Sequence, residues 1–509
     1  MRLAALVATC VLAGALHAAS TSHEAFAGPA SSRIVETADV VRVDGSRVFH
    51  LNVYRGLTAF DVADGDHPKL LSRIAHADGA PVALFLRGNV AIWIESGVEQ
   101  GAPDGRTRGS VVHAFDVTDA THPSSRGSKA VAGHVVDAVA VGEIVYALAD
   151  DETTRESTVS SFRVRGGALE RVAEIHLTGD GGILSASPSS LLVAHTGRVD
   201  LSGGGASLGA ADVTYIDAQD AAGALVKRGT LRVPGSLERW GSDHGRPTLA
   251  FAGGRWATLV TCASAVCGPR DSHYVTAIDF ANPDKPALGA QAMIPPVGGA
   301  ITARFDDGRL YVAARPGYAE TSPSPLIVYD ARAPSMPSPI GAGSLQPNVW
   351  TLVPSAGRLL AIGTQGGSGG AAGGFDVSLR DVDVRDPAHP RVTSAVHFGA
   401  GWTWTPASES DAGFAEDRGL GLVALPFSSG NRRAMQHASG VQLVQRGQGT
   451  LAVRGAVTLR GSIERCFFRG GRLFAVGDLG LWSISYADAT RPLVVGSALH
   501  VDDVTAVRW

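Results

Sequence analysis

The sequence lacks an excess of charge of either sign. Its 44 lysine and arginine residues nearly balance 48 aspartate and glutamate residues, which leaves a formal net charge of −4 at pH 7 for 509 residues. Proteins that hold nucleic acid or anionic lipid by electrostatic attraction carry a basic field, which this composition does not supply. We therefore expect no nucleic-acid partner. Charged residues make up 18% and hydrophobic residues 45%, the balance of a folded globular protein.

Long hydrophobic runs are also scarce. One apolar run follows Arg2 over residues 3–16, and small residues come after it. This is the pattern of an export signal, and the run is too short for a membrane-spanning helix. We predict a signal peptide with a short linker over 1–27. The mature protein is then expected in the periplasm, at the cell surface or outside the cell, with no transmembrane segment.

Cysteine is rare, with four residues in the chain. Cys10 lies inside the first apolar run, where lipid attachment is the less favoured alternative. Cys262 and Cys267 are close in sequence, so we predict that they form a disulfide in an oxidising compartment. A zinc site would require further ligands at suitable spacing, and none follows them. Cys466 lies in an apolar segment and is predicted to be a buried thiol.

Amphipathic helical stretches are missing, and a repeated phrase is present instead. A short alternating strand ends in a turn-forming residue, and a proline follows seven residues later. The six copies begin and end at Asp61 and Pro68, Asp116 and Pro123, Asp279 and Pro286, Asp330 and Pro337, Asp383 and Pro390, and Ser485 and Pro492. Aspartate at a strand end accepts backbone N–H bonds, and proline fixes φ where a missing N–H is tolerated. We interpret these aspartates and prolines as structural turn residues.

The copies begin at multiples of about 53 residues, which predicts nine sequence units. Each unit contains four short stretches of alternating polar and apolar residues, as in the blade of a β-propeller. We predict an all-β fold, a single large propeller over 28–509. Eight or nine blades are possible, because the units around Phe162 and Val444 are weak. The tail 502–509 resembles a first strand and is predicted to pair with residues 40–51, closing the ring.

Residues 38–51 and the strand–Asp–x–x–Asp–x–x–x–Pro phrase resemble known repeats. They are similar to a bacterial secreted β-propeller family that is distantly related to WD-type repeats, and to LVIVD-repeat proteins. The resemblance covers roughly residues 33–509. It implies an exported propeller and brings no shared catalytic signature.

No short motif predicts catalysis or a cofactor. Residues 366–370 spell G-x-S-x-G, but Ala-Ala-Gly-Gly follows where a nucleophile elbow needs a helix. Trp402 and Trp404 are spaced to share one face of a first strand. Two interpretations remain open for this pair, a stacking platform for sugar or peptide and packing between blades, of which packing is favoured.

Acidic residues and histidines in the repeated phrase could suggest a metal site. His67, His122 and His389 each precede the proline in separate repeats, so we expect them to be solvated and far apart. Calcium at Asp381, Asp383 and Asp386 is the less favoured alternative, because the same positions recur as turn residues. We therefore predict no cofactor.

Insertions are concentrated at one position of the unit, between the second and third strands. They are residues 96–110, 149–157, 196–210, 262–272, 314–324, 364–375 and 427–438. In a ring of like-oriented blades these connections emerge on one face, and segments 240–247 and 406–417 are expected on the opposite face. Loops gathered on one face usually carry function.

The favoured function is a non-catalytic binding or scaffold protein of the bacterial cell envelope, holding a protein or glycan partner on the loop-rich face. The alternative is a hydrolase or lyase acting on polysaccharide or lactone, with carboxylates or calcium at the central channel. The sequence does not indicate an oligomeric state.

Overall fold

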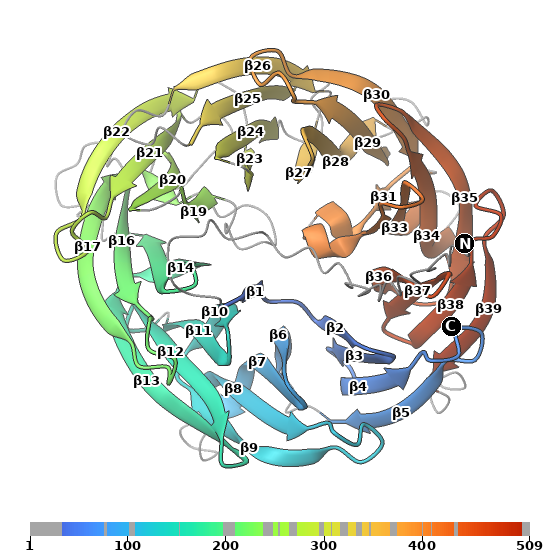
Figure 1. Cartoon of the computed structure of the whole chain (residues 1–509), viewed down its shortest axis with the longest axis horizontal. Helices are drawn as coiled ribbons and strands as arrows, with labels where there is room; N and C mark the ends of the chain where they lie inside the picture. Colours follow the sequence, from blue (N-terminus) through green and yellow to red (C-terminus); the bar gives the residue numbers. More distant parts are fainter. Residues whose placement is uncertain are drawn as a thin grey trace, which may run out of the picture.

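The computed structural model of the chain consists of nine antiparallel β-sheets arranged around a central opening (Figure 1). It describes residues 33–75, 79–100, 107–151, 153–196, 209–237, 248–252, 255–263, 272–294, 300–306, 308–315, 324–331, 338–345, 348–366, 374–399, 401–408, 410–431 and 436–500. Within these ranges there is no α-helix, and none that could cross a membrane. The predicted large propeller is confirmed, and of the two blade counts nine is correct.

Each blade is formed by one continuous segment, with its strands in order from the centre outward. Blade 1 has β2 (Val41–Asp44), β3 (Arg47–Asn52), β4 (Gly56–Asp61) and β5 (Lys69–Ile74). Blade 2 has β6 (Ala80–Arg87), β7 (Val90–Gln100), β8 (Thr107–Asp116) and β9 (Ser124–Val131). Blade 3 has β10 (His134–Val141), β11 (Ile144–Asp151), β12 (Glu156–Arg165) and β13 (Ala168–Thr178).

Blades 4 to 6 follow the same plan, with a divided inner strand in blade 5. Blade 4 has β14 (Asp180–Ala186), β15 (Ser190–Thr196), β16 (Ala210–Asp217) and β17 (Val226–Pro234). Blade 5 has β18 (Ser236–Leu237), β19 (Leu249–Phe251), β20 (Trp256–Cys262), β21 (His273–Asp279) and β22 (Ala287–Ile294). Blade 6 has β23 (Ala300–Asp306), β24 (Arg309–Arg315), β25 (Ser324–Asp330) and β26 (Pro339–Leu345).

The last three blades complete the ring, and the inner strand of blade 8 is also divided. Blade 7 has β27 (Val349–Ser355), β28 (Arg358–Gly366), β29 (Phe375–Asp383) and β30 (Arg391–Phe398). Blade 8 has β31 (Thr403–Trp404), β32 (Ala415–Asp417), β33 (Leu422–Asn431), β34 (Gln436–Arg446) and β35 (Leu451–Leu459). Blade 9 has β36 (Ile463–Arg469), β37 (Arg472–Gly477), β38 (Gly480–Ser485) and β39 (Leu493–Leu499).

The hydrophobic core lies between the blades. In β3, Phe49 packs toward blade 2 against Leu84, whereas Val48 packs toward blade 9 against Phe474. Successive side chains of a strand point to opposite faces of the sheet, so each blade is apolar on both faces. An apolar cluster of this kind occupies each of the nine interfaces between neighbouring blades.

The repeated Asp–Pro phrase forms the turn between the third and fourth strands. In blade 1 the Asp61 carboxylate accepts the amide of Ala63 at 2.9 Å, and the Asp64 carboxylate accepts the amide of Asp66 at 3.0 Å. Equivalent bonds from the first aspartate occur at Asp116, Asp279 and Asp383. Pro337 lies outside the described residues.

These turns dock on the outer strand of the preceding blade. A Cβ added to Gly496 of β39 would lie 2.1 Å from the carbonyl oxygen of Asp66, in the turn of blade 1. A Cβ on Gly229 of β17 would lie 2.3 Å from Cδ of Pro286, in the turn of blade 5. Because glycine has no side chain, the turn of the following blade can approach the backbone of the outer strand closely.

A short N-terminal segment lines the inner edges of blades 1 to 3. Strand β1 (Val35–Thr37) pairs antiparallel with β10 of blade 3. Glu36 then forms ion pairs with Arg42 of blade 1 and Arg87 of blade 2, each at 2.7 Å. The segment ties three blades together before the first blade begins.

Among the described residues, side-chain contacts join blade 9 to blade 1. Arg472 of β37 donates from Nε to the Asp66 carboxylate at 2.6 Å, and Arg465 of β36 donates to Asp39 at 2.8 Å. The Ser483 hydroxyl donates to the carbonyl of Gly65. The predicted pairing of residues 502–509 lies outside the described residues and stays a prediction.

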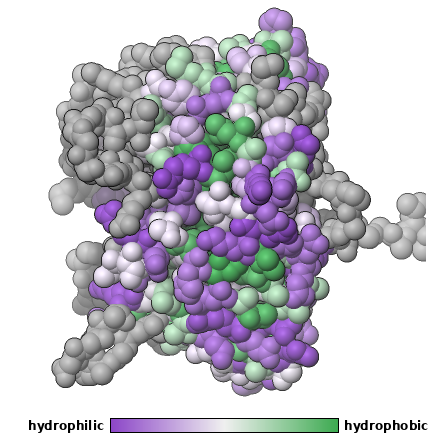
Figure 2. All heavy atoms as spheres, turned by 90° about the vertical axis from the view of Figure 1, so that its left-hand side faces the viewer, coloured by the Kyte–Doolittle hydropathy of each residue, from purple (hydrophilic) through white to green (hydrophobic). Residues whose placement is uncertain are grey.

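The outer rim has a mixed surface. On the side that carries β17 and β22, hydrophilic residues cover most of the described surface, with small apolar groups between them (Figure 2). Val226 of β17 and Leu288 and Met293 of β22 are exposed apolar residues. This part of the rim has no single chemical character.

Candidate functional site

Four aromatic side chains gather at one end of the interface between blades 7 and 8. The ring centroids of Trp350 and Trp404 are 4.2 Å apart, and those of Phe375 and Trp402 are 5.1 Å apart. Both pairs are in edge-to-face arrangements. Trp350 and Phe375 lie at the beginnings of the first and third strands of blade 7. First and third strands run in the same direction, so their beginnings share one end of the ring. At this end of the ring the second strand of each blade leads into the third, and we call it the long-loop end. The other end carries the Asp–Pro turns, and we call it the turn end.

The structure assigns different surroundings to the two tryptophans that were expected to share one strand face. Trp404 belongs to β31, is half-buried, and contacts both Trp350 and Phe375. Trp402 precedes this strand, has a φ of +44° and leaves 37% of its surface exposed. Trp404 thus packs between blades 7 and 8, whereas Trp402 is partly exposed to solvent.

The backbone at Trp402 is held in an unfavourable conformation by its neighbours. A left-handed backbone costs a residue with a Cβ roughly 1–2 kcal/mol. The amide of Gly401 donates to the buried carboxylate of Asp376 at 3.1 Å, and the amide of Gly430 donates to the carbonyl of Trp402 at 3.2 Å. Such strain persists only where the surrounding structure over-determines it, and it is frequent at ligand sites.

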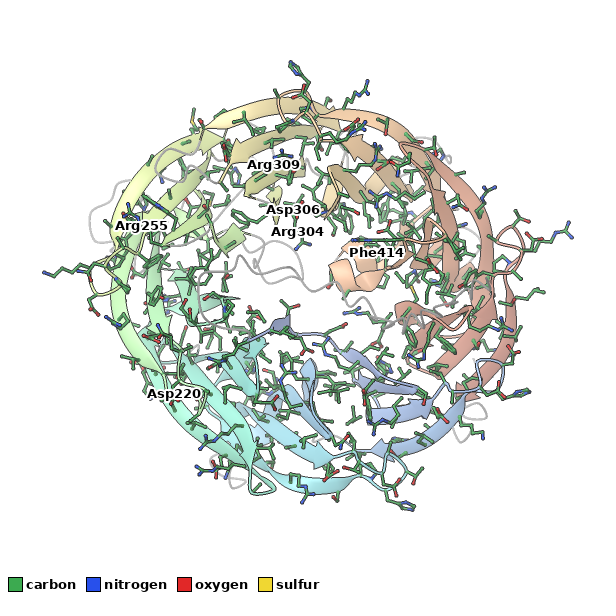
Figure 3. All side chains as sticks on the ribbon, in the orientation of Figure 1. Asp220, Arg255, Arg304, Asp306, Arg309 and Phe414 are labelled. Atoms are coloured by element: carbon green, nitrogen blue, oxygen red, sulfur yellow. The ribbon has the colours of Figure 1, made fainter. Side chains whose placement is uncertain are left out.

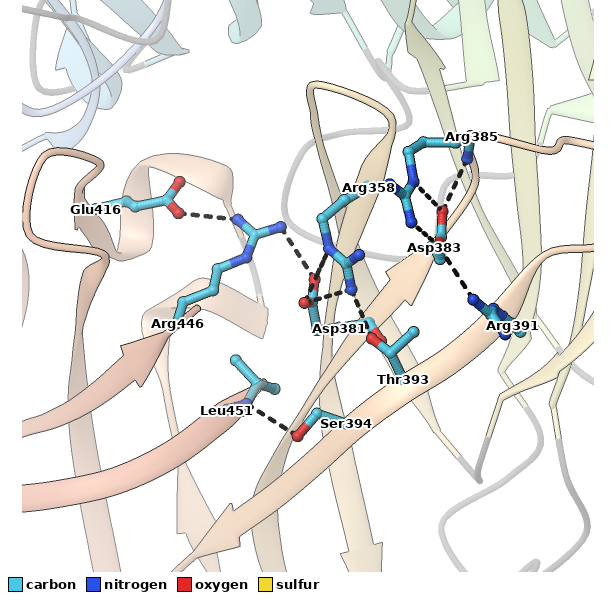
Figure 4. Close-up of polar contacts among 10 residues, drawn as sticks. All are labelled: Arg358, Asp381, Asp383, Arg385, Arg391, Thr393, Ser394, Glu416, Arg446 and Leu451. Carbon is cyan, nitrogen blue, oxygen red and sulfur yellow. Dashed lines mark hydrogen bonds and ion pairs between the residues drawn. The ribbon is translucent and has the colours of Figure 1, made fainter. Parts of the chain in front are cut away.

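A buried ionic network fixes the turn end of the same interface (Figure 4). The Asp381 carboxylate is fully buried and accepts a hydrogen bond from Arg358 of its own blade at 2.6 Å. Arg446 of blade 8 reaches the same carboxylate at 3.3 Å and pairs with Glu416 at 2.9 Å. Blades 7 and 8 are therefore joined at both ends, which keeps the aromatic cluster in place.

The three aspartates considered for calcium have other partners in the structure. Asp381 belongs to the network just described, and a hydrogen bond from Arg385 holds the pKa of Asp383 well below its usual range. Asp386 is hydrogen-bonded to His389 at 2.9 Å. Within the described ranges no group of three or more His, Cys, Asp or Glu side chains is arranged to hold a metal ion.

The three histidines that precede prolines lie on blades 1, 2 and 7. His67, His122 and His389 are exposed, and each Nδ1 is hydrogen-bonded to the aspartate three residues earlier, at 2.9, 3.2 and 2.9 Å. The bond from His67 lowers the pKa of Asp64. Each histidine therefore braces its own turn.

The insertion at 406–417 interrupts the innermost strand of blade 8. It contains two short 3-10 helices, η5 (Pro406–Ser408) and η6 (Asp411–Gly413), between β31 and β32, which both pair with β33. Figure 1 shows it extending toward the central opening. The expectation of a loop at the opposite face was wrong, because the chain resumes pairing with the same strand after the excursion. Residues 240–247 lie outside the described residues.

Some carboxylates at the inner edges of the blades are engaged with cationic or histidine side chains. Glu464 of β36 is hydrogen-bonded to His50 at 3.0 Å, and Asp39 accepts from Arg465. Figure 3 shows Arg304 and Asp306 at the inner edge of blade 6. Arg304 is buried and donates to the carbonyl of Leu352 at 3.0 Å. Glu464, Asp39 and Arg304 thus have polar partners within the protein.

The cysteines have different surroundings. Cys466 is a free, buried thiol, as predicted, and burial raises its pKa to about 12. Cys262 is buried at the end of β20 and takes part in a disulfide. Cys267, its predicted partner, and Cys10 lie outside the described residues, as do 367–370 of the G-x-S-x-G stretch. The pairing of Cys262 with Cys267 stays a prediction.

Sequence reasoning missed the blade 7 half of the aromatic cluster. Trp350 and Phe375 come from strands that the repeat had predicted, but nothing local indicates that they meet Trp402. The only signal for them in the sequence is their place at the beginning of a first or a third strand. A residue at either place lies at the long-loop end.

Comparisons with known proteins support the propeller fold. The profile of the family described as "Beta propeller domain" matches residues 31–199. No curated protein matches the sequence. Similar solved structures include the β-propeller domain of the trilobed protease from Pyrococcus furiosus, with 10% identity over 72% of this chain and 94% of that chain and a TM-score of 0.35.

Two further structures show a similar level of likeness. Hsv2 from Kluyveromyces lactis has 8% identity, covering 83% of this chain and 99% of that chain, with a TM-score of 0.38. Acylaminoacyl peptidase from Pyrococcus horikoshii has 10% identity, covering 80% of this chain and 57% of that chain, with a TM-score of 0.35. Identities and scores this low carry no information about activity. The chain is a nine-bladed β-propeller, and its residues 31–199 match the β-propeller domain family.

Proposed function

We propose that this protein is an exported, non-catalytic binding or scaffold protein of the bacterial cell envelope, which holds a protein or glycan partner at its long-loop end. The observation that carries the proposal is the aromatic cluster at that end, with Trp402 both strained and partly exposed. The longest connections between second and third strands belong to the same end, in blades 2 to 8. Rigid scaffolds usually present binding residues on such connections.

Export is supported by the apolar run over 3–16 and by the disulfide at Cys262, since disulfides persist in oxidising compartments. Intact-mass measurement of the protein from its native cells should show the loss of about 18–27 residues. A mature protein that retains Met1 would contradict export.

The partner's position can be tested by blocking one end of the ring at a time. Thr154→Cys in blade 3 and Ser428→Cys in blade 8 place exposed thiols at the long-loop end, and Thr121→Cys and Asp488→Cys place matched thiols at the turn end. Each thiol is coupled to a maleimide polyethylene glycol at neutral pH. The buried thiol of Cys466 stays protonated and does not compete.

Binding of each labelled protein to an isolated envelope fraction is then measured against its unlabelled form. Labels at the long-loop end should abolish or weaken binding, and labels at the turn end should leave it unchanged. Loss of binding only from turn-end labels would contradict the proposal. Cleavage of polysaccharide or lactone by the purified protein, with one tightly held calcium per chain, would favour the enzyme alternative instead.

A further inference from the structure

We propose that Trp402 is the anchor of a carbohydrate subsite that takes a neutral hexopyranose, stacked on the exposed part of its indole. This inference rests on the proposed function and specifies the ligand class at the same end of the ring. Its starting observation is an exposed indole on a strained backbone beside three further aromatic rings.

The indole of Trp402 is positioned before any ligand arrives. Phe375 meets its ring at an interplanar angle of 66°, and Phe375 in turn contacts Trp404 at 6.0 Å. Hydrogen bonds from Gly401 and Gly430 fix the backbone on either side of the ring. A rigid aromatic side chain loses little conformational entropy on binding, so its contact area contributes to affinity.

Among the described residues, neutral polar side chains pair with the strands of the cluster. Ser428 is exposed and pairs in register with Trp404, and Gln365 is half-buried and pairs with Asp376. The Asp376 carboxylate is buried and accepts the amide of Gly401. Hydroxyl and amide groups match the hydroxyls of a sugar, whose C–H face packs on an aromatic ring. Ser428 and Gln365 offer no charge to a charged ligand.

The exposure of Trp402 favours a sugar ring over a peptide. Peptide anchors are usually side chains enclosed in desolvated pockets. Trp402 instead leaves 37% of its surface exposed, and a planar indole suits the C–H face of a sugar ring. Nucleic acid is disfavoured because the chain has a formal net charge of −4.

The strained backbone makes Trp402→Gly an informative variant. Glycine adopts a positive φ without steric cost, so this substitution removes the indole while relieving the strain. The relief of strain therefore offsets part of the stability that is lost with the contact to Phe375, and the variant should remain folded. Trp256→Ala is a matched control, because Trp256 begins the second strand of blade 5 at the turn end.

The test measures binding of the whole mature protein to immobilised oligosaccharides, neutral and charged, and to proline-rich and aromatic peptides. We expect wild type and Trp256→Ala to bind neutral hexose-containing oligosaccharides, and Trp402→Gly to bind at least about tenfold more weakly, which equals about 1.4 kcal/mol. Failure of wild type to bind any neutral oligosaccharide would overturn the proposal. Unchanged binding by Trp402→Gly, or Trp402-dependent binding of peptides only, would also overturn it.

The two proposals fail in distinguishable ways. If labels at the long-loop end block envelope binding but Trp402→Gly has no effect, the carbohydrate subsite is wrong and the binding end is right. If labels at that end have no effect, both proposals are wrong.

Discussion

Single glycines in the outer strands let neighbouring blades approach each other. A Cβ added to Gly455 of β35 would lie 2.3 Å from Cδ of Pro492, in the turn of blade 9. Gly496 of β39 stands in the same relation to the turn of blade 1. Real Cβ atoms do not come so close to other atoms, so the turn must move if a side chain is added.

We therefore predict that Gly455→Ala lowers the free energy of unfolding by about 1–3 kcal/mol, as overpacking does elsewhere. Gly366→Ala is the control, since nothing lies within 4 Å of its added Cβ. The control should change the free energy by less than about 0.5 kcal/mol. Denaturant unfolding of both variants tests this, and equal losses would contradict the docking of the turn on the outer strand.

The aspartates and prolines of the turns could be predicted from sequence because their chemistry is local. The Asp61 carboxylate bonds to an amide two residues ahead, within the phrase that repeats. The docking glycines could not be predicted, because Gly455 meets a turn more than 30 residues away. Trp402 was identified by its spacing from Trp404, but Phe375 belongs to another blade. Its contact with Trp402 depends on tertiary packing.

At the scale of elements, the interface between blades 7 and 8 combines an aromatic end with an ionic end. Asp381 is fully buried between Arg358 and Arg446, which belong to different blades. Burying a charged carboxylate destabilises the fold unless cationic partners neutralise it. Removing the carboxylate in turn leaves the buried cations with less neutralising charge.

We predict that Asp381→Asn lowers the free energy of unfolding by about 3 kcal/mol, because it leaves the largely buried guanidinium group of Arg358 without a counter-charge and leaves Arg446 with Glu416 alone. Arg385→Gln provides the comparison, since Arg385 pairs with Asp383 from an exposed position. Its effect should stay below about 1 kcal/mol. Thermal or denaturant unfolding distinguishes the two variants, and a larger effect from Arg385→Gln would contradict the role of the buried network.

The repeat predicted the strands because alternation and turn residues recur at a fixed period. It did not predict β1, since three residues that pair with β10 carry no periodic signal. It also placed segment 406–417 at the face opposite the long loops, whereas the segment extends toward the central opening. The sequence shows that residues are inserted in the first strand, but pairing on both sides of the insertion is a property of the folded sheet.

At the scale of the whole molecule, nine blades form a wider ring than the four to eight that are usual. Two described segments lie at the inner edges of this ring, namely β1 and the insertion with η5 and η6. The Thr351 hydroxyl of blade 7 donates to the carbonyl of Ala407 in the insertion at 2.7 Å. The β1 segment and the insertion therefore add contacts among blades at the inner edge of the ring.

A charged pair contributes to the described contacts between blades 9 and 1, so their strength should respond to pH. Hydrogen bonding to Arg472 lowers the pKa of Asp66 below its ordinary value. A carboxyl whose pKa is depressed on folding contributes stability above its unfolded pKa of about 3.9, and this contribution is lost as the pH falls through the folded value. We predict that Asp66→Asn lowers the unfolding temperature at pH 7 and that its difference from wild type shrinks below about pH 4.

Asp284→Asn is the matched variant at an ordinary interface. Asp284 in the turn of blade 5 pairs with Arg228 of blade 4 at 2.6 Å, and its pKa is lowered for the same reason. Both variants should lower the unfolding temperature by similar amounts if the ion pair between blades 9 and 1 contributes as much stability as the ion pair between blades 4 and 5. A difference from wild type that does not change with pH would show that the carboxylate charge is not the cause.

Hydrogen–deuterium exchange with and without solubilised envelope fragments locates the binding surface directly. If the partner binds at the long-loop end, exchange in the bound state should be slower around residues 399–404 and at the beginning of β29. Exchange should not change in the Asp–Pro turns, such as 61–68 and 279–286. Protection confined to those turns, or to the inner strand β23, would contradict binding at the long-loop end.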